Sequence, residues 1–93
     1  MIRVSVTYFL LPSGKEYFPE WFDEVLIESK KQAGFIGLNY TWQESDTTVQ
    51  VVLDFENQFL LDKWTKKAVH GALVAKIEPF LEREIGVTVL NRE

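Results

Sequence analysis

The chain has 93 residues, of which ten are basic and fourteen acidic, and its formal net charge is −4. This balance argues against a nucleic-acid-binding protein, which usually has a basic surface. The absence of cysteine excludes disulfides, thiolate nucleophiles, iron–sulfur clusters and cysteine-based zinc sites. Aromatic residues make up 14% of the chain, enough to fill a core, line a pocket or form an interface. We expect one domain over residues 1–93.

The N-terminal segment has neither the pattern of a membrane span nor that of a signal peptide. Its longest apolar run, from Tyr8 to Leu11, is too short to cross a bilayer. The run also follows an alternating segment, whereas a signal peptide needs an unbroken apolar region. We therefore expect a cytoplasmic protein with no membrane partner.

The first third of the chain predicts a strand followed by a helix. Residues 2–10 alternate between apolar and polar side chains, as in a strand with one buried face. A turn at residues 11–14 ends this strand. The helix is expected from about Phe18, because Pro19 is tolerated in a first turn but clashes inside a helix. Gly34 ends the helix. Its core face is expected to hold Phe22, Val25, Leu26, Ser29 and Ala33.

The rest of the chain predicts a hairpin, a helical stretch and a last strand. Residues 35–43 and 47–55 alternate on either side of a turn at 44–46. Residues 57–84 have helical spacing, and Pro79 should divide this stretch into two segments. Residues 86–90 return to a strand. The strand residues expected to face inward are Ile36, Leu38, Tyr40, Trp42, Val49, Val51, Leu53 and Phe55. The expected core contacts of the helical stretch are Phe59, Leu60, Trp64, Ala68, Ala72 and Leu73.

The order of these elements is βαββαβ, which predicts an α+β, ferredoxin-like antiparallel sheet with both helices on one face. The other face of the sheet would carry small, uncharged polar side chains, with only Arg3 and Asp54 charged. Such a face is either a solvated, threonine-rich surface or the interface of a homodimer in which two sheets face each other. Arg3 and Asp54 would be a pair across that interface or charges at its rim.

Several segments resemble the antibiotic biosynthesis monooxygenase-like (ABM) family of dimeric α+β barrel proteins. The likeness lies in Pro12-Ser13-Gly14-Lys15-Glu16, Ala33-Gly34-Phe35-Ile36-Gly37, the aromatic Phe55, the spacing Phe59…Trp64…His70, and Ile77-Glu78-Pro79-Phe80-Leu81. The resemblance implies a homodimer with a cavity in each subunit between sheet and helices. It also implies cofactor-free oxygenation of aromatic polyketides or quinols, or the degradation of haem.

The sequence departs from the catalytic patterns of that family. Its better-understood oxygenases have an Asn four positions before a Trp near the end of the third strand, where this chain has Val51 and Phe55. Its haem-degrading members need an Asn on the first strand and a His ten residues after the helix Trp. The first strand here has no Asn, and Val74 follows Trp64 by ten residues. The resemblance therefore predicts the fold more firmly than the reaction.

His70 is the only histidine and the only side chain expected to titrate near neutrality. It is either a proton shuttle at the mouth of a cavity or a partly exposed helix residue with no chemical role. One histidine cannot by itself build a transition-metal site, and no carboxylates at ligand spacing accompany it. We therefore expect neither a metal nor a cofactor.

Five aromatic residues are expected to point between the sheet and the helices: Tyr8, Tyr40, Trp42, Phe55 and Trp64. They could line a pocket for a flat organic ligand, or simply form a packed core. The lysines near Trp64 are most simply a solvated helix face. The chain has no phosphate-binding loop, dinucleotide motif, nucleophile elbow or zinc-protease motif. The RNA-binding form of this fold needs aromatic residues on the open sheet face, where this chain has Ser, Thr, Asn and Gln.

The sequence leaves two hypotheses for the function. The first is a homodimeric, cofactor-independent monooxygenase acting on a small phenolic or quinol compound, which His70 and the five aromatic residues would position. The second is a non-catalytic module of the same fold that binds a small molecule or serves in assembly.

Overall fold

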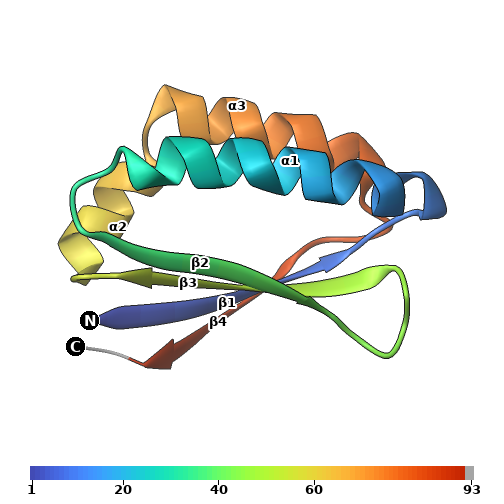
Figure 1. The fold of residues 1–93 in the computed structure, drawn as a ribbon, viewed down its shortest axis with the longest axis horizontal. Coiled ribbons are helices and arrows are strands. Elements are labelled where there is room, and N and C mark those ends of the chain that lie inside the picture. Colours follow the sequence, from blue (N-terminus) through green and yellow to red (C-terminus); the bar gives the residue numbers. More distant parts are fainter. Residues whose placement is uncertain (92–93) are drawn as a thin grey trace.

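The computed structural model describes residues 1–91 and has the predicted βαββαβ order. The strands are β1 (Ile2–Phe9), β2 (Phe35–Trp42), β3 (Thr48–Phe55) and β4 (Gly86–Asn91). They form one antiparallel sheet in the order β2-β3-β1-β4. The helices are α1 (Pro12–Lys30), α2 (Gln58–Thr65) and α3 (Ala68–Ile77), followed by the 3₁₀ turn η1 (Glu78–Phe80). All of them lie on one side of the sheet, which confirms the α+β ferredoxin-like architecture (Figure 1).

The first helix begins at Pro12, earlier than the predicted start at Phe18. Pro12 occupies the first turn, where its missing N–H leaves no hydrogen bond unmade. The helix then packs so tightly on η1 that a Cβ at Gly14 would lie 2.9 Å from the Cβ of Phe80. Pro19 lies inside the helix, contrary to the prediction. These contacts hold the first turns in place, although Pro19 removes one backbone hydrogen bond.

The same helix ends at Lys30, before the predicted end at residue 33, and Ala33 is exposed rather than in the core. The chain turns into β2 at Gly34, whose φ of 86° lies in the left-handed region. The Gly34 carbonyl accepts a hydrogen bond of 2.8 Å from the backbone N–H of Glu56. Leu60 lies so close that a Cβ on Gly34 would be 2.5 Å from its Cδ1 atom.

The second helical stretch is divided at Lys66 and Lys67, not at Pro79 as predicted. Neither glycine nor proline marks this break. Packing accounts for it, because α2 contacts β3 whereas α3 runs beside α1 (Figure 1). Lys67 is extended, with φ −72° and ψ 147°, and α3 begins after it. Pro79 instead lies in η1, after α3 has ended.

The break also changes which residues of this stretch are buried. Trp64 and Leu73 are in the core as predicted. Phe59 is 68% exposed, and Ala68 and Ala72 are exposed too, so these three predicted core contacts are wrong. Two residues that were not predicted, Leu61 and Ile77, are buried in their place. The prediction treated residues 57–84 as one continuous helical pattern. The buried face of α3 is not in register with that of α2, so the pattern places these side chains incorrectly.

A bulge in β2 reverses the prediction for Ile36. Phe35 pairs with Phe55 and Gly37 pairs with Asp54, so Ile36 is the extra residue between them. Ile36 is therefore 50% exposed rather than directed inward. Phe35 takes the inward place and packs edge-on against Phe55, with ring centroids 6.0 Å apart.

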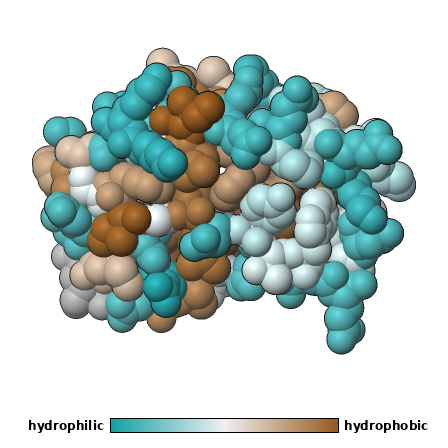
Figure 2. All heavy atoms as spheres, in the orientation of Figure 1, coloured by the Kyte–Doolittle hydropathy of each residue, from teal (hydrophilic) through white to brown (hydrophobic). Residues whose placement is uncertain are grey.

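The core lies between the sheet and the helices and has two parts. One part surrounds Phe18, Trp21 and Phe22 of α1. The other surrounds Phe55 and Trp64. Figure 2 shows hydrophobic residues gathered along the band between the helix layer and the sheet.

The helix layer does not extend over β4. Val89 and Val87 pair with Val4 and Val6 of β1, so all four side chains are on the helix-facing side of the sheet. Val4 is buried, but Val87 is 59% exposed and Val89 is 36% exposed. The sheet is therefore one strand wider than its cover, and this uncovered strip forms one wall of the candidate site described below.

The open face of the sheet is neutral because its two charges pair within the chain. Arg3 Nε donates to Asp54 Oδ1 at 2.8 Å, and Arg3 Nη2 donates to Asp54 Oδ2 at 3.0 Å. This hydrogen bonding, together with the charge of Asp54, raises the pKa of Arg3. Next to the pair, Gln50 Nε2 donates to Ser5 Oγ at 2.8 Å. Of the two alternatives for Arg3 and Asp54, a pair across the interface or charges at its rim, the pair between subunits is corrected to a pair within one subunit.

No helix within residues 1–91 combines the length and the apolar character that crossing a bilayer requires. The expected cytoplasmic location stays a prediction.

Replacement of Gly34 by alanine should lower the free energy of unfolding by about 2 kcal/mol or more. The new Cβ would occupy a left-handed backbone conformation and overlap Leu60. Gly71→Ala is the matched control, since Gly71 lies inside α3 with no atom within 4 Å of an added Cβ. This control should raise the stability by about 0.5–1 kcal/mol. Urea denaturation measures both, and equal effects of the two substitutions would contradict the described turn.

Candidate functional site

The uncovered strip of the sheet and the helices above it enclose a hollow of about 300 Å³, which we name the outer pocket. β1 and β4 supply its floor, and α2 and α3 supply the wall beside that floor. Apolar side chains make most of its wall, among them Val6, Val74 and Val87. Tyr8 and His70 also line it. A concave, mainly apolar hollow with a few polar groups is the usual form of a small-molecule site.

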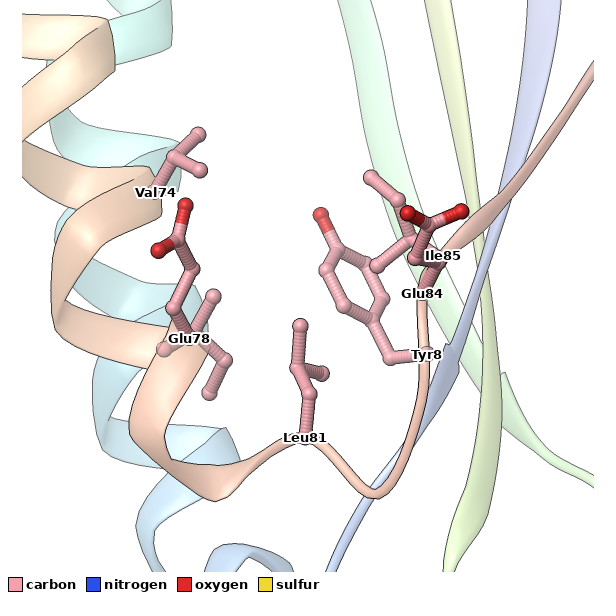
Figure 3. Close-up of a pocket in the computed structure, with 7 residues that line it drawn as sticks. Tyr8, Val74, Glu78, Leu81, Glu84 and Ile85 are labelled. Carbon is pink, nitrogen blue, oxygen red and sulfur yellow. The ribbon is translucent and has the colours of Figure 1, made fainter.

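A second hollow of about 310 Å³, the end pocket, adjoins the outer pocket and shares Tyr8, Val74 and Ile85 with it. It lies between the end of α3 and the segment that leads into β4. Figure 3 shows the Tyr8 hydroxyl pointing into this space, with the carboxylates of Glu78 and Glu84 on its two sides. The negative charges at this end disfavour an anionic ligand and are compatible with a neutral or cationic one.

A third, smaller hollow of about 80 Å³, the inner cavity, lies deeper in the core. It shares Tyr8 and His70 with the outer pocket, and α1 adds Trp21 and Ser29 to its lining. Trp64 also lines it, so the core beneath this predicted site residue is not completely filled. The three hollows meet at Tyr8, which lines all of them.

Tyr8 reaches this position because it is an inward-facing residue near the end of β1. Its ring packs edge-on against Trp21, with centroids 5.4 Å apart, and lies 5.8 Å from the ring of Phe18. Burial raises the pKa of the Tyr8 hydroxyl, so the group stays neutral at physiological pH. Within the described chain this hydroxyl forms no hydrogen bond, so it is available to a ligand.

His70 lies in the first turns of α3 and is half-buried. Its ring packs edge-on against Trp64, with centroids 5.1 Å apart. Burial lowers the pKa of the imidazole, because an apolar environment disfavours its charged form. His70 is therefore mainly neutral near pH 7 and able to accept a proton. Asp62 of α2 also lines the outer pocket, but its carboxylate accepts a hydrogen bond of 2.8 Å from Gln58.

The structure brings together three of the six predicted site residues, Tyr8, Trp64 and His70, around these hollows. The other three lie in packed ring clusters. Tyr40 and Trp42 pack on Phe18, with centroids 5.1 and 5.6 Å away, while Phe55 packs on Phe35. All five aromatic residues point between sheet and helices as predicted, and Tyr8 and Trp64 line the hollows described above. The rings around Tyr40, Trp42 and Phe55 form a packed aromatic core, which was the alternative to a ligand pocket.

Sequence reasoning missed Trp21 and Ser29 as lining residues. Trp21 is 3% exposed, and its indole N–H donates to the Leu73 carbonyl oxygen at 2.7 Å, which ties α1 to α3. The signal was present: Phe18, Trp21, Phe22, Val25 and Ser29 follow the i, i+3, i+4, i+7, i+11 spacing. The predicted face began at Phe22, one turn later, so it contained Ser29 but left out Trp21.

No group of three or more histidine and acidic side chains is placed to hold a metal ion among residues 1–91. The residues that line the outer pocket contribute a single imidazole and one carboxylate, from His70 and Asp62. This donor set does not match the ligand sets that proteins use for transition metals.

Comparisons with known proteins support the fold. No protein-family model matches the sequence, and no curated protein matches it significantly. A solved structure titled antibiotic biosynthesis monooxygenase is similar, with a TM-score of 0.86 at 12% identity over 100% of this chain and 99% of that one. The chain has the ABM-like fold.

Two further structures share this ABM-like fold over almost the full length. A conserved protein from Methanosarcina mazei Go1 gives a TM-score of 0.90 at 15% identity, covering 99% of this chain and 92% of that one. Rv0793 from Mycobacterium tuberculosis gives 0.86 at 14% identity, covering 99% and 94%. At such identities the likeness shows a common fold, and the chemistry has to be argued from the site.

The positions that depart from the known ABM catalytic patterns now have a structural context. Val51 lines the inner cavity and Val74 lines the outer and end pockets, so both contribute apolar wall where those patterns have Asn and His. Phe55 is fully buried against Phe35. Tyr8, Ser29 and His70 supply polar groups to these hollows. Asp62 adds a carboxylate to the outer pocket, and Glu78 and Glu84 add theirs to the end pocket.

The pKa of His70 in the folded protein should lie below its ordinary value of 6.5. Because the unfolded chain then binds the proton more tightly, the free energy of unfolding should fall as the pH decreases through 6.5. His70→Gln should remove this contribution from the pH profile. His70 is the only histidine, so an NMR titration of its ring proton reads the pKa directly. A value above 6.5 would contradict the described burial.

Proposed function

We propose that this protein binds a flat phenolic or quinol compound in the outer pocket and acts on it as a cofactor-independent monooxygenase. The observation that carries the proposal is the convergence of Tyr8 and His70, two neutral polar side chains, on one apolar hollow between sheet and helices. A flat apolar body would bury the valine walls, and the ligand's hydroxyl would provide the missing hydrogen-bond partner.

The protonation states of the two residues assign their roles. Neutral His70 accepts the phenol proton as a general base, and protonated Tyr8 donates a hydrogen bond to the resulting phenolate oxygen. The reaction adds one atom of O₂ to a ring carbon and releases the other as water. A phenol and O₂ thus give a quinone and water. The substrate supplies all the electrons, and the proton held by His70 leaves with the water.

A second candidate function is ligand binding without catalysis. It is favoured by the apolar side chains of Val51 and Val74 at positions that are polar in the catalytic patterns of the resembled family. It requires the same pocket and the same ligand class. The two functions differ only in whether the bound phenol is consumed together with O₂.

We also propose that two copies of the chain associate through the open face of their sheets. Arg3 and Asp54 neutralise each other on this face, and Ser5 and Gln50 bond to each other. The two charges of the face are thus neutralised and its other polar side chains are uncharged, so two such faces can pack together. The resemblance to the ABM family, which implies a homodimer, supports the same association.

Binding and turnover of 2-naphthol test the proposed function. Tyr8→Phe should weaken binding by about 3- to 10-fold, the effect of one lost hydrogen bond. His70→Ala should lower the rate of O₂ consumption by about 100-fold or more while a ligand still binds. Tyr17→Phe is the matched control, because the Tyr17 ring packs on Phe80 outside the outer pocket.

Fluorescence titration and an oxygen electrode measure these effects. Binding without any O₂ consumption by the unmodified protein would select the non-catalytic alternative. Equal losses in Tyr8→Phe and Tyr17→Phe would contradict the assigned pocket, because both substitutions remove one hydroxyl.

Val52→Glu should convert the proposed dimer to a monomer, because it places a charge at the centre of the open face. Val52 lies between Asn39 and Ser5 in one cross-strand row. Ile27→Glu is the matched control on the exposed side of α1, where Ile27 is 58% exposed. Light scattering should give a dimer mass for the unmodified protein and for the control. A monomer in all three samples would exclude this interface.

A further inference from the structure

Ser29 has a buried hydroxyl without a hydrogen-bond partner. It lies on α1, its side chain is fully buried, and within the described chain its Oγ atom has no donor or acceptor in reach. A serine inside a helix commonly bonds back to the carbonyl four residues earlier, but this one does not. Alanine would fit the same space, favour the helix and avoid the desolvation of a polar atom. Such orphaned groups are rare in folded proteins, so Ser29 calls for a partner from outside the chain.

The hydroxyl lies at the inner cavity, which adjoins the proposed ligand site on its inner side. The inner cavity and the outer pocket share four residues: Val6, Tyr8, Leu53 and His70. Ser29 lines the inner cavity but not the outer pocket. It comes from α1, whereas the floor of the outer pocket comes from β1 and β4. Polar groups are thus available at both ends: Tyr8 and His70 toward the outer pocket, and Ser29 at the deep end.

The sizes of the two spaces define what could occupy them. The outer pocket, at about 300 Å³, has room for the body of an aromatic ligand. The inner cavity, at about 80 Å³, has room for a few water-sized groups, such as an oxygen substituent and the ring edge that carries it. Its other walls are mainly apolar, among them Val25 and Leu38, so the position of the oxygen is set by Ser29.

We propose that Ser29 determines specificity for aromatic compounds that carry oxygen substituents at two opposite ends. One oxygen binds at Tyr8 and His70, and the second exchanges a hydrogen bond with Ser29 Oγ in the inner cavity. The proposal rests on the proposed ligand site and narrows its ligand class from phenols in general to quinol-like diols. A compound that lacks the second oxygen leaves Ser29 unpaired, so it binds less tightly.

The test compares 2,6-dihydroxynaphthalene with 2-naphthol, which differ by one hydroxyl at the far end of the same ring system. The unmodified protein should bind the diol about tenfold more tightly than the monophenol. Ser29→Ala should remove this preference by weakening the diol about tenfold and leaving the affinity for 2-naphthol unchanged. Ser13→Ala, an exposed serine on the same helix, is the matched control and should keep the preference. Isothermal titration measures all of these affinities.

The outcomes separate this inference from the proposed function. If both compounds bind equally, or if Ser29→Ala leaves the preference intact, the role of Ser29 is refuted while the ligand site stands. If neither compound binds, both proposals are refuted. The urea midpoint of the ligand-free protein is the second readout. Ser29→Ala should leave it unchanged or raise it, whereas a fall would show that Ser29 serves the fold, for example through a buried water.

Discussion

The position of α3 decides where this molecule is filled and where it is open. The Trp21 indole N–H donates to the Leu73 carbonyl oxygen at 2.7 Å, and this buried bond joins α3 to α1. At the surface, Lys76 of α3 adds an ion pair of 3.1 Å with Glu24 of α1. Buried polar contacts of this kind are strong in an apolar environment and tolerate little displacement. Because α3 is held beside α1, it does not cover β4. The apolar strip of the sheet at Val87 and Val89 therefore stays partly exposed.

Two different environments follow from this arrangement. On the β2 side, Phe18, Tyr40 and Trp42 pack ring against ring and fill the space. On the β4 side, Val87 and Val89 face the helices but remain partly exposed, and hollows open above them. Tyr8, Ser29 and His70 bring polar atoms to those hollows, and among the described residues the Ser29 Oγ atom is buried without a hydrogen-bond partner. A ligand with a flat apolar body would cover the exposed valines, and its polar ends would form hydrogen bonds with the polar atoms.

The sequence predicts the element order and the fold correctly because strand alternation and helix periodicity are local patterns. Errors occur where distant contacts override those patterns. Pro12 starts α1 early because the first turn packs on Phe80, and α3 restarts the helical phase without a glycine or proline signal. The bulge at Ile36 depends on the pairing of Phe35 with Phe55, which no local pattern encodes.

The candidate site is predictable only in part for the same reason. Aromatic residues at inward positions are visible in the sequence, but whether a ring packs against others or borders a cavity depends on the placement of α3. Tyr8 and Tyr40 have the same pattern in their strands, and only the uncovered strip beside β1 distinguishes them. Ser29 appears in the sequence as a small residue on a helix face, and its missing partner becomes apparent only in three dimensions.

A crystal structure of the protein soaked with 2-naphthol would show whether the outer pocket binds the ligand. We expect the ring between α3 and β4, with its oxygen in hydrogen-bond contact with the Tyr8 hydroxyl and the His70 imidazole. A structure in which α3 closes onto β4 and the protein's own side chains fill the hollow would contradict it. So would a ring that binds elsewhere on the surface.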